Sequence, residues 1–564
     1  MAQGWIQIVV FFALVFACVP LLGGYMARVF TGQVDLLAPV ERGLHRVLRV
    51  DSASNQGWKT YAAGVIALSL FGWLLLYVIL RTQTIHPVNP NDFHSGTWDL
   101  SFNTASSFVT NTNWQFYGGE TTLTPFSQAV GLAVQNFVSG ATGICVAIAV
   151  IRGISNRRSG EIGLGNFFVD LIRAILYVLL PLSIVASLLL ASQGVLQSID
   201  FPVASQEAIK FLGTNGGGFF NVNSAFPYEN PNGLTNWIEM FLMLAIPTSL
   251  TYTFGRMVGS RRQGWAIFSA MFILLAVSVV VVYLAELHNT PAQHLAGVVG
   301  NVANMEGKEV RFGIANTALF ASITTAISCG AVNAAMESLT GIGGLMPMMN
   351  MGGYSESVFG GVGTGIYTML LYILIAVFVG GLMVGRTPEY LGKKVEARDI
   401  KLVSLAVIFV PLMILVLTAV AIGTKWGAPS IYASGPQGFS ETLYAYVSQA
   451  NNNGSAFAGY TGYLQPELGN LGANGVTFAD VLGGLAMLLG RFVSIVVLLA
   501  IAGSFVRKRV SPPGVGTLRT DTPTFVAMNV FVVALIGALT LLPALLLGPV
   551  IQSLTDQPVL RNEP

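Results

Sequence analysis

Four short clusters of glycine, asparagine, serine and threonine recur along the chain, and none of them contains an acidic or basic residue. Glycine adopts backbone conformations closed to other residues, so such a segment can aim successive carbonyl oxygens in one direction. Carbonyl oxygens arranged in this way replace the hydration shell of a cation such as K⁺. We therefore expect a potassium-type filter formed by the backbones of Thr110, Asn111, Thr112, Asn113, Thr214, Asn215, Gly216, Gly217, Ser328, Cys329, Gly330, Asn452, Asn453 and Gly454.

Each cluster follows a stretch of about ten apolar or amphipathic residues, which is too short to cross a bilayer. The stretches are Trp98–Val109, Ser205–Gly213, Ile314–Ile327 and Phe439–Ala450. We take one residue of each cluster as equivalent: Thr112, Gly216, Gly330 and Gly454. These residues are separated by 104, 114 and 124 residues, so a similar unit recurs four times. A half-helix that stops inside a membrane leaves unpaired carbonyl groups, which are tolerated only where protein or a water-filled path surrounds them. The pattern predicts four units that bring four carbonyl strips together around one axis.

Two other interpretations of the clusters are possible. Glycine and asparagine in a loop mark ordinary turns, and small residues in membrane proteins mark close helix packing. Neither explains why the cluster follows a half-length stretch four times, so we favour the filter. A ring of acidic side chains would favour a different cation pore, but the clusters contain no Asp or Glu.

Three residues outside the clusters are candidates for supporting the ion path. Gln115 follows the first cluster, and a neutral amide there can set the filter width by hydrogen bonding; ordinary loop packing is the alternative. Arg491 lies inside an apolar run, where an unpaired charge is costly, so we expect it to line a cavity below the filter and limit leakage. The alternative is an arginine satisfied by neighbouring carbonyl groups. Glu356 lies in Gly341–Gly365, whose glycines and Pro347 predict an interrupted helix rather than a plain loop.

The composition excludes a water-soluble protein. Of the 564 residues, 10% are charged and 53% hydrophobic, and the mean hydropathy is +0.67, whereas an ordinary soluble domain has about 25% charged residues. The formal net charge of +2 is too small to indicate nucleic-acid binding. The three cysteines and five histidines are scattered, so neither a disulfide framework nor a metal site besides the K⁺ filter is indicated.

Ten apolar runs are long enough to cross a hydrocarbon core of about 30 Å. They lie near Trp5–Tyr25, Tyr61–Leu80, Phe126–Ile151, Phe167–Ala191, Leu234–Val258, Trp265–Glu286, Val362–Val384, Leu402–Gly423, Val481–Phe505 and Phe525–Leu547. Long and short junctions alternate after the first run, and the short junctions, with the segment after that run, hold 20 of the 28 Lys and Arg residues. Because cytoplasmic loops retain positive charge, we expect the clusters and both termini to face the outside.

Five motifs carry a resemblance to a known family. They are TNTNWQFYGG (Thr110–Gly119), GTNGGGFFN (Gly213–Asn221), SCGAVNAAMES (Ser328–Ser338), FGGVGTG (Phe359–Gly365) and NNNGSAFAG (Asn451–Gly459). Together they resemble the KdpA family, the potassium-translocating subunit of the bacterial Kdp P-type ATPase complex, in the superfamily of K⁺ transporters. The resemblance covers essentially the whole chain.

The resemblance implies an all-α integral membrane protein. Its ten transmembrane helices would form four channel-like helix, pore loop, helix repeats in one chain, with one extra helix at each end. The expected divisions are 1–60 for the first extra span and a cytoplasmic segment; 61–152, 153–262, 263–400 and 401–510 for the four pore repeats; and 511–564 for the last extra span. The third repeat is the one with the interrupted second helix, and the resemblance implies a gating loop there.

The resemblance also implies a function. The chain would be the potassium-binding and translocating subunit of an ATP-driven, high-affinity K⁺ uptake complex in the bacterial cytoplasmic (inner) membrane, with both termini periplasmic. Its filter would select K⁺ from the outside and pass it to an ATP-hydrolysing P-type pump subunit. The other implied partners are a peripheral subunit with a single membrane anchor, a small single-span subunit and membrane lipid.

The chain itself lacks the motifs of a nucleotide site. It contains neither the G-x-x-x-x-G-K-[ST] phosphate loop nor the D-K-T-G motif of P-type pumps, and its short junctions cannot hold a domain of about 100 residues. We therefore expect no catalytic residue and no nucleotide cofactor, with K⁺ as the transported ligand. Two alternatives stay open: a self-contained potassium channel or symporter of the same superfamily, and a membrane scaffold whose glycine-rich loops only pack.

Overall fold

The computed structural model describes residues 2–156, 162–383, 385–462, 473–512, 514 and 517–554. Some of the basic residues counted above, Arg157, Arg158 and Arg561, lie outside the described residues. The same is true of Val384, where we expected the seventh span to end, and of the last residues of the segment 511–564.

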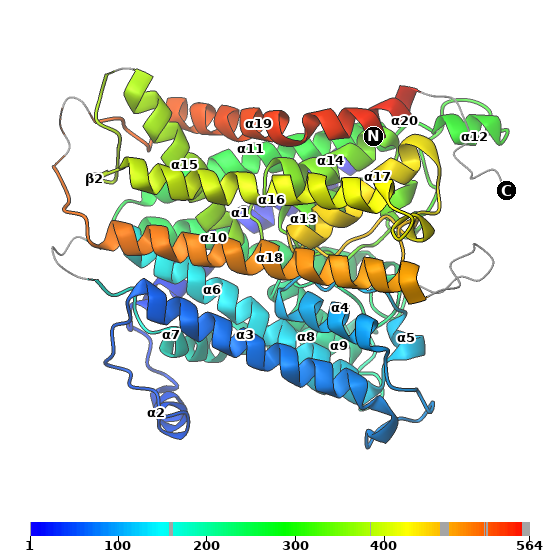
Figure 1. Ribbon diagram of the computed structural model, residues 1–564, viewed down its shortest axis with the longest axis horizontal. Helices are drawn as coiled ribbons and strands as arrows, with labels where there is room; N and C mark the ends of the chain where they lie inside the picture. Colours follow the sequence, from blue (N-terminus) through cyan, green and yellow to red (C-terminus); the bar gives the residue numbers. More distant parts are fainter. Residues whose placement is uncertain are drawn as a thin grey trace.

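Ten helices in the described part of the chain are long and apolar enough to cross a membrane, which confirms the ten predicted spans. They lie side by side along the long axis of the molecule, horizontal in Figure 1. The spans are α1 (Ala2–Phe30), α3 (Trp58–Arg81), η2 with α6 (Ser127–Leu132 and Ala133–Ser155), α7, η3 and α8 (Phe167–Arg173, Ala174–Leu179 and Leu180–Ser192), α10 (Gly233–Met257), α11 (Arg261–Glu286), α15 (Thr364–Met383), α16 (Ala397–Gly423), α18 (Ala473–Val506) and α19 (Pro523–Leu545). The span that begins with α11 continues to α12 (Pro291–Leu295), and the span that begins with α19 continues through η9 (Leu546–Val550) and α20 (Ile551–Leu554).

The spans differ in how much of their apolar surface the protein covers. In α10 and in the span that contains α6, 83% of the most apolar window is buried, against 33% in α1 and α3 and 28% in α19. A helix that is apolar all round must be surrounded by protein or by lipid. The first and last spans therefore face lipid, while α6 and α10 lie at the centre of the fold.

The first span is attached to α10 through a close approach of the two backbones. A β-carbon at Gly23 of α1 would lie 2.5 Å from the carbonyl oxygen of Ser249 on α10. The Thr253 hydroxyl donates a hydrogen bond to the carbonyl oxygen of Gly23 at 3.0 Å. Small residues and interhelical hydrogen bonds of this kind are how helices associate in lipid.

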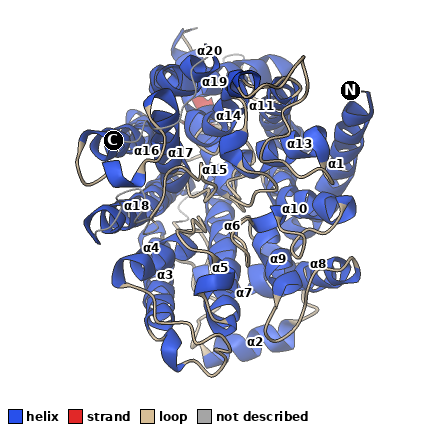
Figure 2. Cartoon of the chain, turned by 90° about the vertical axis from the view of Figure 1, so that its right-hand side faces the viewer, coloured by secondary structure: helices blue, strands red, loops and turns tan. Residues whose placement is uncertain are grey.

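Four shorter helices complete the core, and none is long enough to span a membrane. They are α4 (Trp98–Val109), α9 (Val203–Leu212), α13 (Gly313–Ala326) and α17 (Gly435–Ala450). Figure 2, which views the molecule from the right-hand end of Figure 1, shows these four half-helices arranged around the centre. We call this end the half-helix end. We call the opposite end, which carries α2 (Ala38–Val47), the basic end.

The helical structure between α13 and α15 is broken. The chain forms α14 (Gly341–Met348) and a π-helical turn, η6 (Met349–Gly353), and it then leaves the helical conformation until α15 begins at Thr364. Within the break, Glu356 and Phe359 have φ values of 59° and 56°. Such values are uncommon for residues other than glycine.

One small element departs from the all-α expectation. At the basic end, β1 (Glu389–Tyr390) pairs antiparallel with β2 (Lys393–Lys394). The two residues between the strands, Leu391 and Gly392, have φ values of 52° and 80°, as a type I′ hairpin turn requires. The hairpin is too short to leave a hydropathy pattern in the sequence.

Candidate ion-binding site

The four half-helices end in the same way. In each, the backbone N–H of one residue reaches back five positions to a carbonyl oxygen of the last helical turn, at 2.8 to 2.9 Å. The pairs are Thr112 with Ser107, Asn215 with Lys210, Cys329 with Thr324 and Asn453 with Ser448. This is the bond of a Schellman motif, which requires a left-handed residue just before the donor. That residue is Asn111, Thr214, Ser328 or Asn452, with φ between 48° and 70°.

These shared bonds correct the equivalence used above for the first cluster. The second left-handed position of each strip lies two residues after the first, at Gly216, Gly330, Gly454 and, in the first strip, Asn113 with φ 55°. Thr112 is therefore the counterpart of Asn215, Cys329 and Asn453, one residue away from where we placed it. Residue type misled the comparison because asparagine, like glycine, tolerates the left-handed conformation.

The strips form a closed ring in the order of the sequence. A side chain at Gly216 would collide with the carbonyl of Cys329 in the third strip, and one at Gly330 with the carbonyl of Asn453 in the fourth. A side chain at Gly454 would collide with the carbonyl of Thr112, which closes the ring onto the first strip. The second strip therefore packs its backbone against the third, the third against the fourth and the fourth against the first, and none of these three glycines has room for a β-carbon.

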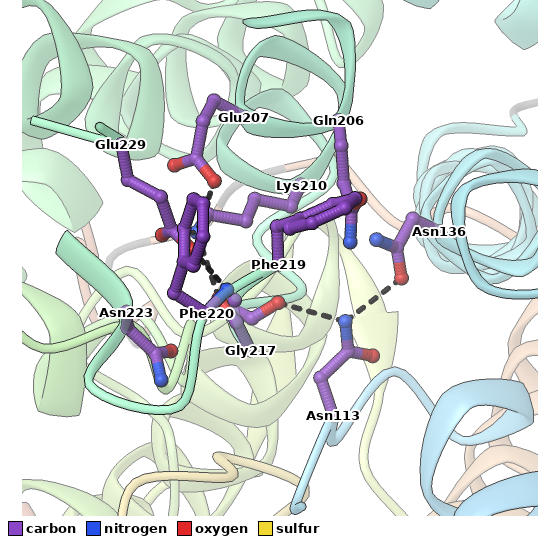
Figure 3. Close-up of polar contacts among 12 residues, drawn as sticks. Asn113, Asn136, Gln206, Glu207, Lys210, Gly217, Phe219, Phe220, Asn223 and Glu229 are labelled. Carbon is purple, nitrogen blue, oxygen red and sulfur yellow. Dashed lines mark hydrogen bonds and ion pairs between the residues drawn. The ribbon is translucent and has the colours of Figure 1, made fainter. Parts of the chain in front are cut away.

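Between the first and second strips, side-chain amides make the connection. Asn113 donates from Nδ2 to the carbonyl oxygen of Gly216 at 2.8 Å and to Oδ1 of Asn136 at 2.8 Å, the latter bond visible in Figure 3. Asn111 donates to the carbonyl oxygen of Thr214 at 2.9 Å. These bonds hold two glycine-rich backbones in register.

Side-chain amides of the fourth strip also form hydrogen bonds to neighbouring segments. Asn452 donates to the hydroxyl of Thr112 at 3.0 Å, and Asn453 donates to the carbonyl oxygen of Thr324 at 2.9 Å. The side chains of the strips are fully buried and carry no charge. The chemistry available at this ring is therefore that of neutral oxygen ligands, which suits a monovalent cation.

The side chain of Gln115 forms hydrogen bonds to the backbone of the residue that follows the second strip. Its Oε1 accepts the backbone N–H of Gly218 at 2.9 Å, and its Nε2 donates to the carbonyl oxygen of the same residue at 3.1 Å. Nε2 also donates to the Tyr117 hydroxyl at 3.2 Å. The side chain fixes the backbone beside the filter in both directions.

Glu356 and Arg491 line one cavity, with room for water of about 50 Å³. The cavity also contacts Asn451 and Asn452 at the end of the fourth half-helix. Arg491 donates to the Thr364 hydroxyl at 3.1 Å. The structure thus places both residues beside the point where the fourth half-helix ends and the fourth strip begins.

The broken segment before α15 lies directly against the ring of strips. The backbone N–H of Val362 donates to the Thr214 hydroxyl at 2.9 Å, and that of Gly361 donates to the carbonyl oxygen of Ile327 at 2.5 Å. The segment therefore contacts the second and third strips, where their half-helices end.

One charged residue beside the second strip was missed by the sequence reasoning. The fully buried Lys210 of α9 donates to the carbonyl oxygen of Gly217 at 2.8 Å and forms ion pairs with Glu207 at 2.7 Å and Glu229 at 3.0 Å (Figure 3). A lysine inside a short apolar stretch, seven residues before a filter glycine, was the available signal. Within the described residues, no group of three or more His, Cys, Asp or Glu side chains could hold a metal ion.

Comparisons with known proteins agree with this geometry. A sequence model of the family described as "KdpA: Potassium-transporting ATPase A subunit" matches residues 9–554. The proteins named "Potassium-transporting ATPase potassium-binding subunit" of Granulibacter bethesdensis and Rhizobium rhizogenes are each 50% identical, over 573 and 574 residues, and each alignment covers 98% of both chains. The crystal structure of the potassium transporter TrkH from Vibrio parahaemolyticus is similar in fold, with a TM-score of 0.52 and 15% identity over 87% of this chain and 99% of that one.

Proposed function

This chain belongs to the KdpA family of potassium-transporting ATPase A subunits, and from that premise we propose that its ring of four strips is the site where the transporter binds and selects K⁺. The chain is the potassium-binding subunit of a K⁺-transporting ATPase and a multi-pass membrane protein. The self-contained channel or symporter is not favoured, because relatives of nearly full length carry the subunit's name.

The observation that carries the proposal is the repetition of one backbone geometry in four strips that touch in a closed ring. A single Schellman ending occurs in many helices, but four that converge inside a membrane protein place carbonyl groups around a common centre. The ligands are the backbones of residues 110–113, 214–217, 328–330 and 452–454, and Gln115 fixes the strip beside it. The four pore repeats proposed for residues 61–510 each contribute one strip.

The position of the cavity supports a path beyond the filter. Arg491 and Glu356 lie beside the beginning of the fourth strip, and the broken segment contacts the second strip and the end of the third half-helix. The broken segment would gate the exit from the filter, and the cation of Arg491 would limit leakage. K⁺ would then pass to an ATP-hydrolysing P-type subunit, since this chain carries no nucleotide motif and needs no nucleotide cofactor of its own.

The remaining partners and the orientation follow from the same premise. A peripheral subunit with one membrane anchor and a small single-span subunit would complete the complex. The distribution of Lys and Arg supports a cytoplasmic position for the basic end. The half-helix end and both termini would then face the periplasm, in the bacterial inner membrane.

Co-expression with the neighbouring subunits tests the proposal. We expect the assembled complex to hydrolyse ATP with saturable stimulation by K⁺, and we expect this chain alone in vesicles to conduct little K⁺. Fluxes of K⁺ through the chain alone, without co-isolated partners, would instead support a self-contained channel. Absence of both stimulation and flux would leave only a packing role for the glycine-rich loops.

A further inference from the structure

A buried side chain supports the backbone of each strip from the same position of its half-helix. The position is the residue whose carbonyl oxygen accepts the Schellman bond: Ser107, Lys210, Thr324 or Ser448. The Ser107 hydroxyl donates to the carbonyl oxygen of Trp114 at 2.9 Å, and the Thr324 hydroxyl to that of Ala331 at 2.7 Å. The Ser448 hydroxyl accepts the backbone N–H of Gly454 at 3.0 Å. Three strips are therefore supported by a hydroxyl group.

The second strip uses a lysine at this position. Nζ of Lys210 donates to the carbonyl oxygen of Gly217, seven residues on, as the hydroxyls of Ser107 and Thr324 donate to a carbonyl seven residues on. We propose that Lys210 is a positioning residue for K⁺ binding. The carboxylates of Glu207 and Glu229 offset its positive charge, so that the ammonium group can lie beside the ion path without repelling K⁺. This inference rests on the proposed function of the ring.

The backbone of the second strip requires a stronger supporting hydrogen bond than the backbones of the other three strips. Gly216 and Gly217 are adjacent and both left-handed, with φ of 73°. Neither has a side chain that could form a hydrogen bond to fix the backbone. Glycine loses more conformational freedom on ordering than any other residue. A hydrogen bond from an ammonium group is roughly twice as strong as a neutral one, so the lysine offsets that cost where it is greatest.

The two carboxylates remove the disadvantage of a positive charge near K⁺. Both ion pairs are completely buried, with 0% exposure of every side chain involved. Oε1 of Glu229 also accepts the backbone N–H of Phe220 at 2.7 Å, which fixes the turn that follows the strip (Figure 3). A third buried carboxyl, Glu239, lies on α10, but among the described residues the ion-pair partners of Lys210 are Glu207 and Glu229.

Burial of three charges would be a poor way to stabilise a fold. Replacing a buried ion pair by apolar residues of similar volume is often neutral or stabilising, whereas removing one partner costs about 3–5 kcal/mol. Stability alone therefore does not account for the cluster, whereas an ammonium group binds a carbonyl more strongly than a hydroxyl does. Its value is in positioning the strip.

The test removes the bond without leaving charges unpaired. In the assembled complex, the triple variant Lys210→Met, Glu207→Gln, Glu229→Gln keeps side chains of similar size. We expect the K⁺ concentration for half-maximal stimulation of ATP hydrolysis to rise about tenfold or more and the preference for K⁺ over Rb⁺ to narrow, while the maximal rate changes less than about threefold, since loss of about 1.4 kcal/mol of binding corresponds to tenfold.

The matched control is a second fully buried lysine pair among the described residues, Lys308 with Glu286 at 2.9 Å. Its variant Lys308→Met, Glu286→Gln should leave both the half-maximal concentration and the Rb⁺ preference unchanged. An unchanged triple variant, or the same shift in the control, would overturn the inference.

A second variant decides the matter if the triple variant does not assemble. Thr324→Val removes the supporting hydroxyl of the third strip without burying a charge, and it should raise the half-maximal K⁺ concentration and narrow the Rb⁺ preference; no effect would overturn the inference. Failure of the proposed function is distinguishable from both results, because it would appear as a wild-type complex without any stimulation by K⁺.

Discussion

Gly330 illustrates how the packing of the strips depends on the absence of side chains. Its φ is +92°, and a β-carbon there would collide with the carbonyl of Asn453 and lie 3.0 Å from the Cα of Gly454. The left-handed conformation costs a residue with a β-carbon about 1–2 kcal/mol. The collision adds to that cost, and both effects would destabilise the contact between the third and fourth strips.

We expect Gly330→Ala to weaken K⁺ binding at least about tenfold, because 1.4 kcal/mol is a factor of ten in affinity. The K⁺ dependence of ATP hydrolysis by the assembled complex measures this. Gly233→Ala, at the start of α10, is the control, since no atom lies within 4 Å of its β-carbon position. Equal affinity in the two variants would mean that the ring tolerates a side chain and does not form the filter.

At the scale of residues, the sequence allowed the strips to be located but not aligned. Gly216, Gly330 and Gly454 stand out by type, whereas Asn113 takes the same left-handed conformation without being glycine. Only the backbone bond from Thr112 to Ser107 reveals the shift of one residue. Lys210 was overlooked for a related reason: its role depends on a carbonyl seven residues away, which residue type does not indicate.

At the scale of elements, the half-helix α4 coincides with the stretch Trp98–Val109 that hydropathy and the following polar cluster predicted. The ten spans were also predictable, because a bilayer requires long apolar runs. The π-helical turns and the hairpin of β1 and β2 were not. These features depend on contacts between distant segments or on two left-handed residues in a turn, and neither changes the hydropathy.

The segments between spans are joined by polar contacts at the half-helix end. Glu337 accepts the backbone N–H of Gly459 at 2.9 Å, and Glu441, in the middle of α17, accepts that of Ala433 at 3.2 Å. Burial, together with the nearby negative charge of Glu337, raises the pKa of Glu441 to about 7 from the usual 4.5. Burial also raises the pKa of Glu337.

A raised carboxyl pKa means that the folded protein binds more protons than the unfolded chain between pH 4.5 and about 7. Stability is therefore expected to fall as pH rises through that window and to level off above it. Thermal unfolding in detergent should show a Tm about 2 °C higher at pH 5.5 than at pH 8.

Glu441→Gln should reduce this pH dependence and raise the Tm at pH 8, because the amide stays neutral and can still accept the Ala433 N–H. Asp200→Asn, at an exposed aspartate, should behave like the wild type. If Glu441→Gln keeps the full pH dependence, the proton is not taken up by this pair.

At the scale of the whole molecule, segments from three distant parts of the chain meet where the filter ends. The break before α15 contacts the second and third strips, and the cavity beside the fourth strip is lined by Arg491 of α18 and Thr364 of α15. The fold similarity to TrkH, at 15% identity, covers 87% of this chain. An arginine inside an apolar span costs several kcal/mol unless it is paired or solvated, so its place beside a water-sized cavity is consistent with an effect on the ion.

We expect Arg491→Ala to increase passive K⁺ entry into vesicles that contain the assembled complex without ATP. Two unit charges 4 Å apart interact by about 4 kcal/mol at an effective dielectric constant of 20 and by about 1 kcal/mol in water, so removal of the repulsion should raise the flux by roughly fivefold or more. Arg491→Lys retains the charge and should stay close to the wild type, as should Arg519→Ala, whose side chain is 66% exposed. An unchanged flux and an unchanged ratio of K⁺ transported to ATP hydrolysed in Arg491→Ala would show that this arginine only packs, satisfied by Thr364, and that leakage is limited elsewhere along the path.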